Sequence, residues 1–287
     1  MKHLFIALSL LLACAFNANA AVADSVVYHH EATDTAAIVK ILDATRKAEL
    51  ETPADRLAFI ARQLLGSPYV AATLEGDTEV LRINMSEFDC TTLVETAIAL
   101  SLTAAVDTAS YNEFAHNLRN IRYRDGVVDG YASRLHYVSD WIADNTRRGN
   151  FVEVTAQCPL AKRDTKSINY ISTHSRNYTD LLNNDSLVNC IKEVEAKYNN
   201  YRYQYIPATS LNSEALAKWF NNGDIVLFTT SAKGLDVSHM GIIVVERNRV
   251  RLLHASSNSH TVMLDNQPLY NYVMSNRSIN GIRIVRL

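Results

Sequence analysis

The sequence predicts an α+β fold in which one apolar helix packs across an antiparallel sheet. Good helix formers run from Leu93 to Leu102, which is typical of a buried helix. Four apolar runs near the C-terminus predict the strands, and the segment Glu246–Arg249 between the middle two has the length of a hairpin connection. The four strand-like runs cover residues 225–229, 240–246, 250–255 and 282–285.

Periodicity and turn signals place the other elements in order. Thr52, Pro53 and Asp55 form, in sequence, a helix cap, a first helical residue and a capping-box partner. The patterns predict helices over residues 34–50, 53–64, 110–120, 131–142, 184–200 and 213–220. They predict short strands over 80–83, 151–154 and 201–206, and a polar loop over 162–177.

The first twenty residues have the pattern of a secretory signal peptide. Lys2 precedes an apolar run from Leu4 to Phe16, and Ala18-Asn19-Ala20 is a small-residue cleavage site. We therefore expect residues 1–20 to be removed on export. The alternative is a lipoprotein anchored through Cys14, because the residues before Cys14 resemble a lipoprotein box.

Composition bounds the class of protein. The formal net charge of −2 gives no basic surface for nucleic acid or an anionic membrane. No later run reaches the roughly 18 apolar residues that a membrane-spanning helix needs. We expect residues 21–287 to form a single domain with a largely helical insertion at about 105–220. The signal-peptide pattern predicts export, which in a Gram-negative bacterium leads to the periplasm, and we expect the exported domain to be a monomer.

A cysteine and two histidines are the residues that can carry chemistry. Cys90 lies where polar residues give way to the predicted helix, so its thiol would lie at a helix N-terminus, where the pKa of a thiol is lowered. His239 and His254 lie in two neighbouring predicted strands. Each residue alone is more often structural than catalytic. In this order, however, they match a cysteine nucleophile, its base and the residue that orients the base.

The cysteine count allows one free thiol. Cleavage after Ala20 leaves Cys90, Cys158 and Cys190. In an oxidising compartment this odd number fits one reactive thiol and at most one disulfide, which Cys158 and Cys190 could form.

The predicted helix over residues 131–142 has two interpretations. It contains tyrosines, Arg134 and His136 close to Trp141. Such a helix can be an amphipathic surface helix with an aromatic core face. It can also form one wall of a substrate cleft, because arginine and aromatic side chains bind sugars and carboxylates.

Several segments resemble the NlpC-type papain-like cysteine hydrolases of bacterial cell walls. The resemblance is carried by Phe88-Asp89-Cys90 and by residues 223–228, 238–242 and 254–256. Two departures, Thr91-Thr92 after the cysteine and the long separation of Cys90 from His239, match one branch, the N-acetylmuramoyl-L-alanine amidase-like family. Further segments that resemble this family are residues 88–95, 129–141, 172–174, 205–207 and 233–239.

This resemblance implies a papain-like core and an amidase that needs no cofactor. Cys90 would be the nucleophile, His239 the base and His254 its orienter. The substrate would be a soluble peptidoglycan fragment, cut between N-acetylmuramic acid, in its 1,6-anhydro form, and L-alanine. Residues expected to bind this substrate are Tyr69, Asp89, Thr91, Arg134, His136 and Ser238.

Three alternatives stay open. The commoner activity of the superfamily cuts the bond between D-Glu and the diamino acid inside the stem peptide. A zinc amidase could use ligands drawn from Cys90, His174, His239 and His254. A non-catalytic peptidoglycan-binding module could keep the same fold.

Overall fold

The computed structural model describes residues 25–247 and 249–287. The expected signal peptide, and with it Cys14, lies outside the described residues. Within them, no helix combines the length and apolar character needed to cross a membrane.

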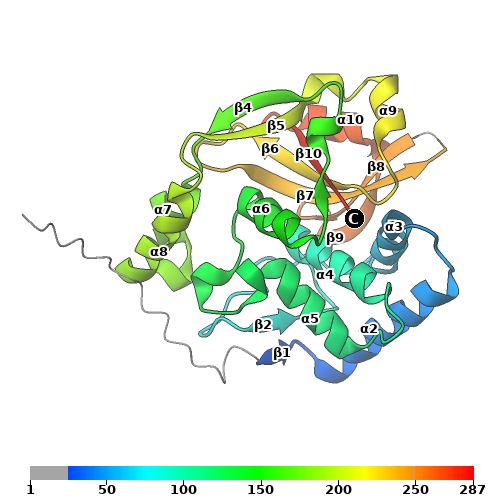
Figure 1. Cartoon of the computed structure of the whole chain (residues 1–287), viewed down its shortest axis with the longest axis horizontal. Helices are drawn as coiled ribbons and strands as arrows, with labels where there is room; N and C mark the ends of the chain where they lie inside the picture. Colours follow the sequence, from blue (N-terminus) through cyan, green and yellow to red (C-terminus); the bar gives the residue numbers. More distant parts are fainter. Residues whose placement is uncertain (1–24, 248) are drawn as a thin grey trace, which may run out of the picture.

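The main layer of the described chain is an eight-stranded sheet of order β4-β5-β10-β6-β7-β8-β9, with β3 also paired to β10 (Figure 1). Every neighbouring pair in this sheet is antiparallel. The strands are β3 (Val152–Glu153), β4 (Lys162–Lys166), β5 (Tyr201–Pro207), β6 (Ile225–Thr230), β7 (Val237–Glu246), β8 (Arg249–Ser256), β9 (Thr261–Pro268) and β10 (Ile279–Arg286). The four predicted strands are confirmed as β6, β7, β8 and β10, and Glu246 pairs with Arg249 where β7 turns into β8.

Helices cover both faces of the sheet (Figure 1). One face and its hydrophobic cluster carry α2 (Glu31–Lys47), α3 (Pro53–Gln63), α4 (Cys90–Thr103), α5 (Tyr111–Arg122) and α6 (Val138–Arg148). The opposite face packs against α9 (Glu214–Trp219) and α10 (Leu269–Ser275). A third cluster contains α7 (Tyr170–Thr173) and α8 (Asp185–Ala196), and a parallel pair is formed by β1 (Val26–Tyr28) and β2 (Leu81–Ile83). The mixed α+β class with an antiparallel sheet is therefore confirmed.

Helix α4 is the most buried of the described α-helices, as its apolar sequence indicates. Eleven of its 14 residues are buried. Its buried acid Glu95 accepts a hydrogen bond from Nε of Arg122 on α5 at 2.6 Å, and Arg122 also donates to the carbonyl of Arg82 on β2 at 2.7 Å. Because an unpaired charge in the core is costly, this pair fixes α4 relative to its neighbours.

The helix predicted over residues 131–142 is wrong in its first half. Tyr131–Ser133 is a single 3-10 turn, the next residues are extended, and α6 begins only at Val138. The extended stretch is held because Arg134 pairs with Tyr123 and the amide of Leu135 donates to the carbonyl of Arg122 at 3.0 Å. Tertiary backbone pairing here overrides the local helix propensity.

The segment 105–220 is not only helical, since it supplies β3, β4 and β5 to the main sheet. Strand β4 lies where a loop was predicted. Its charged residues do not look like a core strand, but Lys162–Lys166 pairs along its length with β5 at the sheet edge. Charged residues are common in edge strands because they discourage pairing with other chains.

The disulfide considered from the cysteine count is not formed. None of Cys90, Cys158 and Cys190 is in a disulfide bond. Cys158 is buried in the cluster beneath α9 and α10, whereas Cys190 is on α8, beside the separate cluster of tyrosines and isoleucines.

Candidate active site

The N-terminus of α4 is fixed by a capping box that places Cys90 in the first turn. Asp89 is the cap, and its Oδ1 accepts hydrogen bonds from the amide and the hydroxyl of Thr92 at 2.8 and 2.9 Å. The hydroxyl of Thr92 in turn accepts from the amide of Asp89 at 2.9 Å. Asp89, which the resemblance led us to expect as a substrate-binding residue, therefore also has a structural role as the cap of α4.

The thiol of Cys90 is partly buried and protonated. Burial, and then the nearby carboxylate of Asp89, raise the pKa of this thiol to about 11, although hydrogen bonds from the amide of Met240, the hydroxyl of Thr91 and the cysteine's own amide act to lower it. The expected lowering of the thiol pKa at the helix N-terminus is therefore wrong, because desolvation outweighs the favourable amides. The contact with Met240 places the sulfur one residue from His239.

His239 and His254 form a hydrogen-bonded pair, with Nε2 of His239 2.7 Å from Nδ1 of His254. A bulge precedes the pair: Phe228 is opposite His239, but Thr229 is opposite Val237, so Ser238 is an extra residue. Bulges of this kind redirect the next side chain. The bulge therefore helps to set the direction in which the side chain of His239 leaves β7.

A glycine allows the second histidine to approach. A Cβ atom on Gly241 would lie 2.7 Å from the carbonyl oxygen of Leu253 and 3.1 Å from Cβ of His254. Any other residue at this position of β7 would push β8 away. Gly241 was visible in the sequence only as part of the motif Ser238–Ile242, and its packing reason comes from the structure.

Both imidazoles are neutral at physiological pH. Burial, and then the neighbouring His254, lower the pKa of His239 to about 3. Burial lowers the pKa of His254 to about 4, although Asp265 acts to raise it. The resting site therefore holds a neutral thiol and two neutral rings, and Nδ1 of His239 is available to take a proton.

Two tyrosines lie next to the thiol, and the sequence analysis named only one of them. Cys90 acts on the pKa of both Tyr69 and Tyr272, and burial is the main reason that both values are raised. Tyr69 is placed by a bridge between its backbone and Phe88, directly before α4. Tyr272 was missed because the short helix α10 carries no motif.

A small cavity of about 170 Å³ adjoins the first turn of α4. Four of the six predicted substrate-binding residues line it: Asp89, Thr91, Arg134 and His136. Tyr69 is beside the thiol instead, and Ser238 is exposed at the start of β7. The structure therefore brings all six to the surroundings of Cys90, although only four share one cavity.

Arg134 is buried and already paired. Its guanidinium is 3.1 Å from Glu75 and 3.6 Å from Glu79, and it lies 5.0 Å above the ring of Tyr131. Its Nε atom is buried without a hydrogen-bond partner. Of the two expected partners of Arg134, a carboxylate and a sugar oxygen, the structure favours the sugar oxygen. Glu75 and Glu79 already neutralise the guanidinium, whereas its Nε can still donate to a neutral oxygen.

His136 supplies the cavity with a neutral ring. Burial lowers its pKa to about 3, and its Nε2 is 2.7 Å from the carbonyl oxygen of Tyr131. Since that oxygen can only accept, Nε2 carries the hydrogen and Nδ1 is an acceptor. His136 therefore contributes an acceptor, its Nδ1, to the lining of the cavity.

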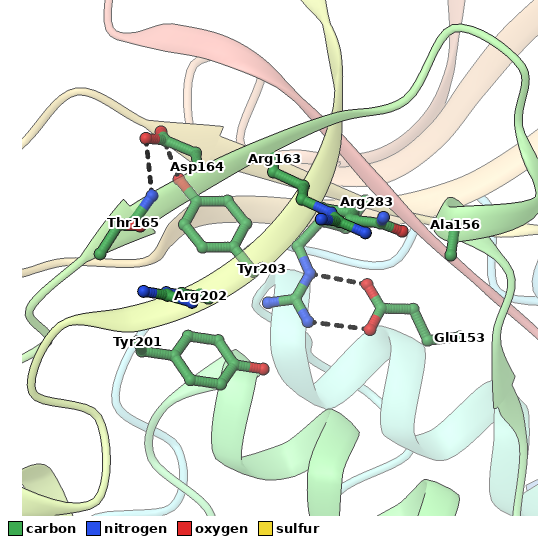
Figure 2. Close-up of a pocket in the computed structure, with 10 residues that line it drawn as sticks. Glu153, Ala156, Arg163, Asp164, Thr165, Tyr201, Arg202, Tyr203 and Arg283 are labelled. Carbon is green, nitrogen blue, oxygen red and sulfur yellow. Dashed lines mark hydrogen bonds and ion pairs between the residues drawn. The ribbon is translucent and has the colours of Figure 1, made fainter.

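A larger cavity, of about 800 Å³, lies elsewhere in the described part of the chain. It lies over β4, β5 and β10, where Arg283 pairs with Glu153 and Tyr203 donates to Asp164 (Figure 2). None of Cys90, His239 or His254 lines it. Cavity volume alone would therefore have directed attention away from Cys90, His239 and His254.

A metal centre has no obvious location in the part of the chain that the structure describes. No group of three or more His, Cys, Asp and Glu side chains there is arranged to hold an ion. His174, one of the residues a zinc site could have used, follows α7 and stacks on Tyr170 with ring centroids 4.1 Å apart.

The geometry agrees with a family match. Residues 59–282 match the family model described as N-acetylmuramoyl-L-alanine amidase-like. The chain belongs to this family. No curated protein sequence matches the chain.

Solved structures support the membership in this amidase-like family. An N-acetylmuramoyl-L-alanine amidase from Bacteroides uniformis ATCC 8492 is 40% identical, with a TM-score of 0.78 over 82% of this chain and 98% of that one. A Bacteroides fragilis protein, provisionally named a xylanase, is 40% identical with a TM-score of 0.75 over 79% and 99%. LPG0564 from Legionella pneumophila, at 22% identity, covers 89% and 96% with a TM-score of 0.66 and shares the fold.

Proposed function

We propose that this protein is a cysteine-dependent amidase of the bacterial cell wall with a papain-like core. The observation that carries the proposal is the hydrogen-bonded pair His239–His254 at the strand start that contacts the Cys90 thiol. Family membership supports the substrate class, a muropeptide cut between N-acetylmuramic acid and L-alanine. The amidase name belongs to the Bacteroides uniformis relative and reaches this chain as a proposal.

The neutral site calls for general-base catalysis rather than a preformed thiolate. The sulfur of Cys90 attacks the lactyl carbonyl carbon while its proton passes to Nδ1 of His239. For this, Nε2 of His239 must carry a hydrogen and donate it to Nδ1 of His254. The carbonyl oxygen becomes an oxyanion, and we assign its stabilisation to the backbone amide of Cys90 at the start of α4.

The second half of the reaction returns the site to its starting state. The protonated His239 gives its proton to the nitrogen of L-alanine, and the C–N bond breaks to leave a thioester on Cys90. Water then attacks the thioester while His239 takes its proton. Collapse releases the lactyl carboxylic acid, and His239 returns the proton to the sulfur.

The cavity beside α4 supports a sugar-sized end to the substrate cleft. Its walls include residues of the segment 105–220, namely Tyr131, Arg134, Leu135, His136 and Tyr178. A cleft closed at one end admits the terminal sugar of a 1,6-anhydro-muropeptide and excludes an intact glycan strand. We therefore propose soluble muropeptides as the partners of this enzyme, with no cofactor required.

Mass spectrometry of a defined anhydro-muropeptide tests the cleaved bond. We expect free anhydro-N-acetylmuramic acid and an intact peptide that begins with L-alanine. Release of anhydro-N-acetylmuramoyl-L-Ala–D-Glu, together with a peptide that begins with the diamino acid, would instead show the endopeptidase activity known in the wider superfamily. Absence of turnover with every fragment would favour a binding module. Intact sacculi are the control, and we expect them to be poor substrates.

We further propose that the enzyme is exported and works in the periplasm as a monomer. The support is the signal-peptide pattern of residues 1–20. Mass measurement of the mature N-terminus distinguishes cleavage after Ala20 from a lipid-modified Cys14.

A further inference from the structure

Tyr272 on α10 packs against both rings of the histidine pair. Its ring centroid is 5.2 Å from that of His254, at an interplanar angle of 76°, and 6.2 Å from that of His239. Phe228 closes the same group from β6, 5.3 Å from Tyr272 and stacked 5.7 Å from His239. The two histidines thus lie in an aromatic enclosure.

One atom of this enclosure has no conventional partner. His254 is only 3% exposed, and its Nε2 is buried without a hydrogen bond. Leaving a buried N–H unsatisfied costs about 1–3 kcal/mol. An edge-to-face ring contact offers a substitute, because an N–H aimed at an aromatic face is weakly attracted to its π-electrons. The 76° contact with Tyr272 has the required edge-to-face angle.

We propose that Tyr272 is a positioning residue whose ring face accepts the Nε2–H of His254 and so fixes the tautomer of that histidine. With the hydrogen on Nε2, Nδ1 of His254 can only accept. It must then accept from Nε2–H of His239, which leaves Nδ1 of His239 unprotonated and ready for the thiol proton. The opposite tautomer of His254 would place a hydrogen on Nδ1 of His239 and block the base.

This inference rests on the proposed function for its catalytic meaning, but its structural claim can be measured without turnover. Nitrogen-15 NMR of histidine-labelled mature protein reports which ring nitrogen of His254 carries the hydrogen. Tyr272→Phe keeps the ring and removes the hydroxyl, so we expect the Nε2–H form to persist. Tyr272→Leu removes the ring, so we expect a mixture of tautomers.

Tyr270→Leu is the matched control. Tyr270 is on the same helix and packs against the same hydrophobic cluster as Tyr272, but the ring contacts of the histidine pair in the described residues are made by Phe228 and Tyr272. We expect Tyr270→Leu to leave the tautomer and kcat unchanged. Asp265→Asn tests the rival view that Asp265, which acts on the pKa of His254, fixes the tautomer through a water molecule.

Steady-state kinetics on the anhydro-muropeptide give the second measurement. We expect Tyr272→Leu to lower kcat about tenfold with little change in KM, because a weak contact controls an essential tautomer. We expect Tyr272→Phe to restore most of that loss. A loss in Tyr272→Phe as large as in Tyr272→Leu would overturn the proposal, since the hydroxyl would then be the active group.

The two hypotheses fail in different ways. If Tyr272→Leu leaves His254 wholly in the Nε2–H form, or if only Asp265→Asn changes it, the positioning role of Tyr272 is wrong whatever the enzyme cuts. If the tautomer changes as expected but the wild-type protein cuts a different bond, the positioning role stands and the proposed substrate is wrong.

Discussion

The two sides of the first turn of α4 differ sharply in electrostatics. On one side, Cys90, His239 and His254 form a cluster in which every group is neutral, because burial raises the thiol pKa and lowers both imidazole pKa values. On the other side, the cavity is lined by Glu75 and Arg134, with Glu79 in contact behind them. Under the proposed function, hydrogen-bond direction would control the reaction, whereas fixed charge would shape the cavity for the substrate.

Substitution of the nucleophile gives the largest expected effect. We expect Cys90→Ala to abolish hydrolysis without unfolding the protein, because the change removes only one small side-chain atom at a partly buried position. Activity is measured on the anhydro-muropeptide, and thermal unfolding serves as the control. A folded variant that keeps more than a few per cent of the activity would show that the neutral cluster is not the reaction centre.

The histidine pair should show unequal losses. We expect His239→Ala to lower kcat by roughly 10²–10⁴-fold, because this residue moves the proton. We expect His254→Ala to cost less, since water in the vacated space can accept the hydrogen of His239. Kinetic constants of the two variants at one pH test this order. Equal losses, or a larger loss at His254, would reverse the two roles.

Substitution of Arg134 tests the role of the charged side, which is the cavity lined by Glu75 and Arg134. We expect Arg134→Ala to lower kcat/KM, by an amount that corresponds to a loss of about 1.5–3 kcal/mol of transition-state stabilisation. It should also lower the free energy of unfolding by about 3 kcal/mol, because Glu79 would stay buried without its partner.

Arg124→Ala is the matched control for this loss of stability. Arg124 binds the buried carboxylate of Asp140 at 2.7 and 3.0 Å, and it does not line the cavity. Denaturant unfolding should show a similar loss in both variants. An equal fall of kcat/KM in the two would mean that Arg134 acts only through the fold.

The pH dependence is expected to give the smallest effect. It tests whether the histidines of the neutral cluster stay unprotonated at mildly acidic pH. With pKa values of about 3 for His239 and about 4 for His254, both bases stay unprotonated at pH 5. The kcat/KM profile should therefore stay within about twofold of its pH 7 value down to pH 5 and fall below pH 4. An acid limb near the ordinary histidine pKa of about 6.5 would show that the pair is not desolvated.

The same pKa values give the direction of the stability change. Because both folded-state values lie below the unfolded value of 6.5, the unfolded chain binds more protons as the pH falls below that value. The free energy of unfolding should therefore decrease on acidification, by at most about 1.4 kcal/mol per pH unit for each histidine. Denaturant titrations between pH 7 and pH 4 measure this slope.

Local chemistry explains which parts of the fold were predictable. The apolar run of α4, the cap Thr52 of α3 and the hairpin of β7 and β8 follow from side chains close in sequence. Strand β4 and the extended residues around Arg134 depend on backbone partners far along the chain. Sequence patterns carry no information about such partners, so a loop and a helix were predicted in their place.

The candidate site divides in the same way. Residue types and order pointed to Cys90, His239 and His254. In the structure the amide of Met240, the residue after His239, is hydrogen-bonded to the sulfur of Cys90, and the two histidines are hydrogen-bonded to each other. The sequence could not give the sign of the thiol pKa shift, because burial depends on packing. It also could not show Tyr272, since a tyrosine on a short helix is one among 14 in the chain.

The position of β10 has a consequence for how this molecule folds. Although it is the last strand in sequence, it lies in the interior of the sheet, between β5 and β6. The two parts of the sheet cannot join until Ile279–Arg286 is in place, so many contacts form late and over long sequence separations, which slows folding. A chain that has not yet incorporated β10 exposes two open strand edges to aggregation. We therefore expect the chain to depend on protection from aggregation until β10 is in place.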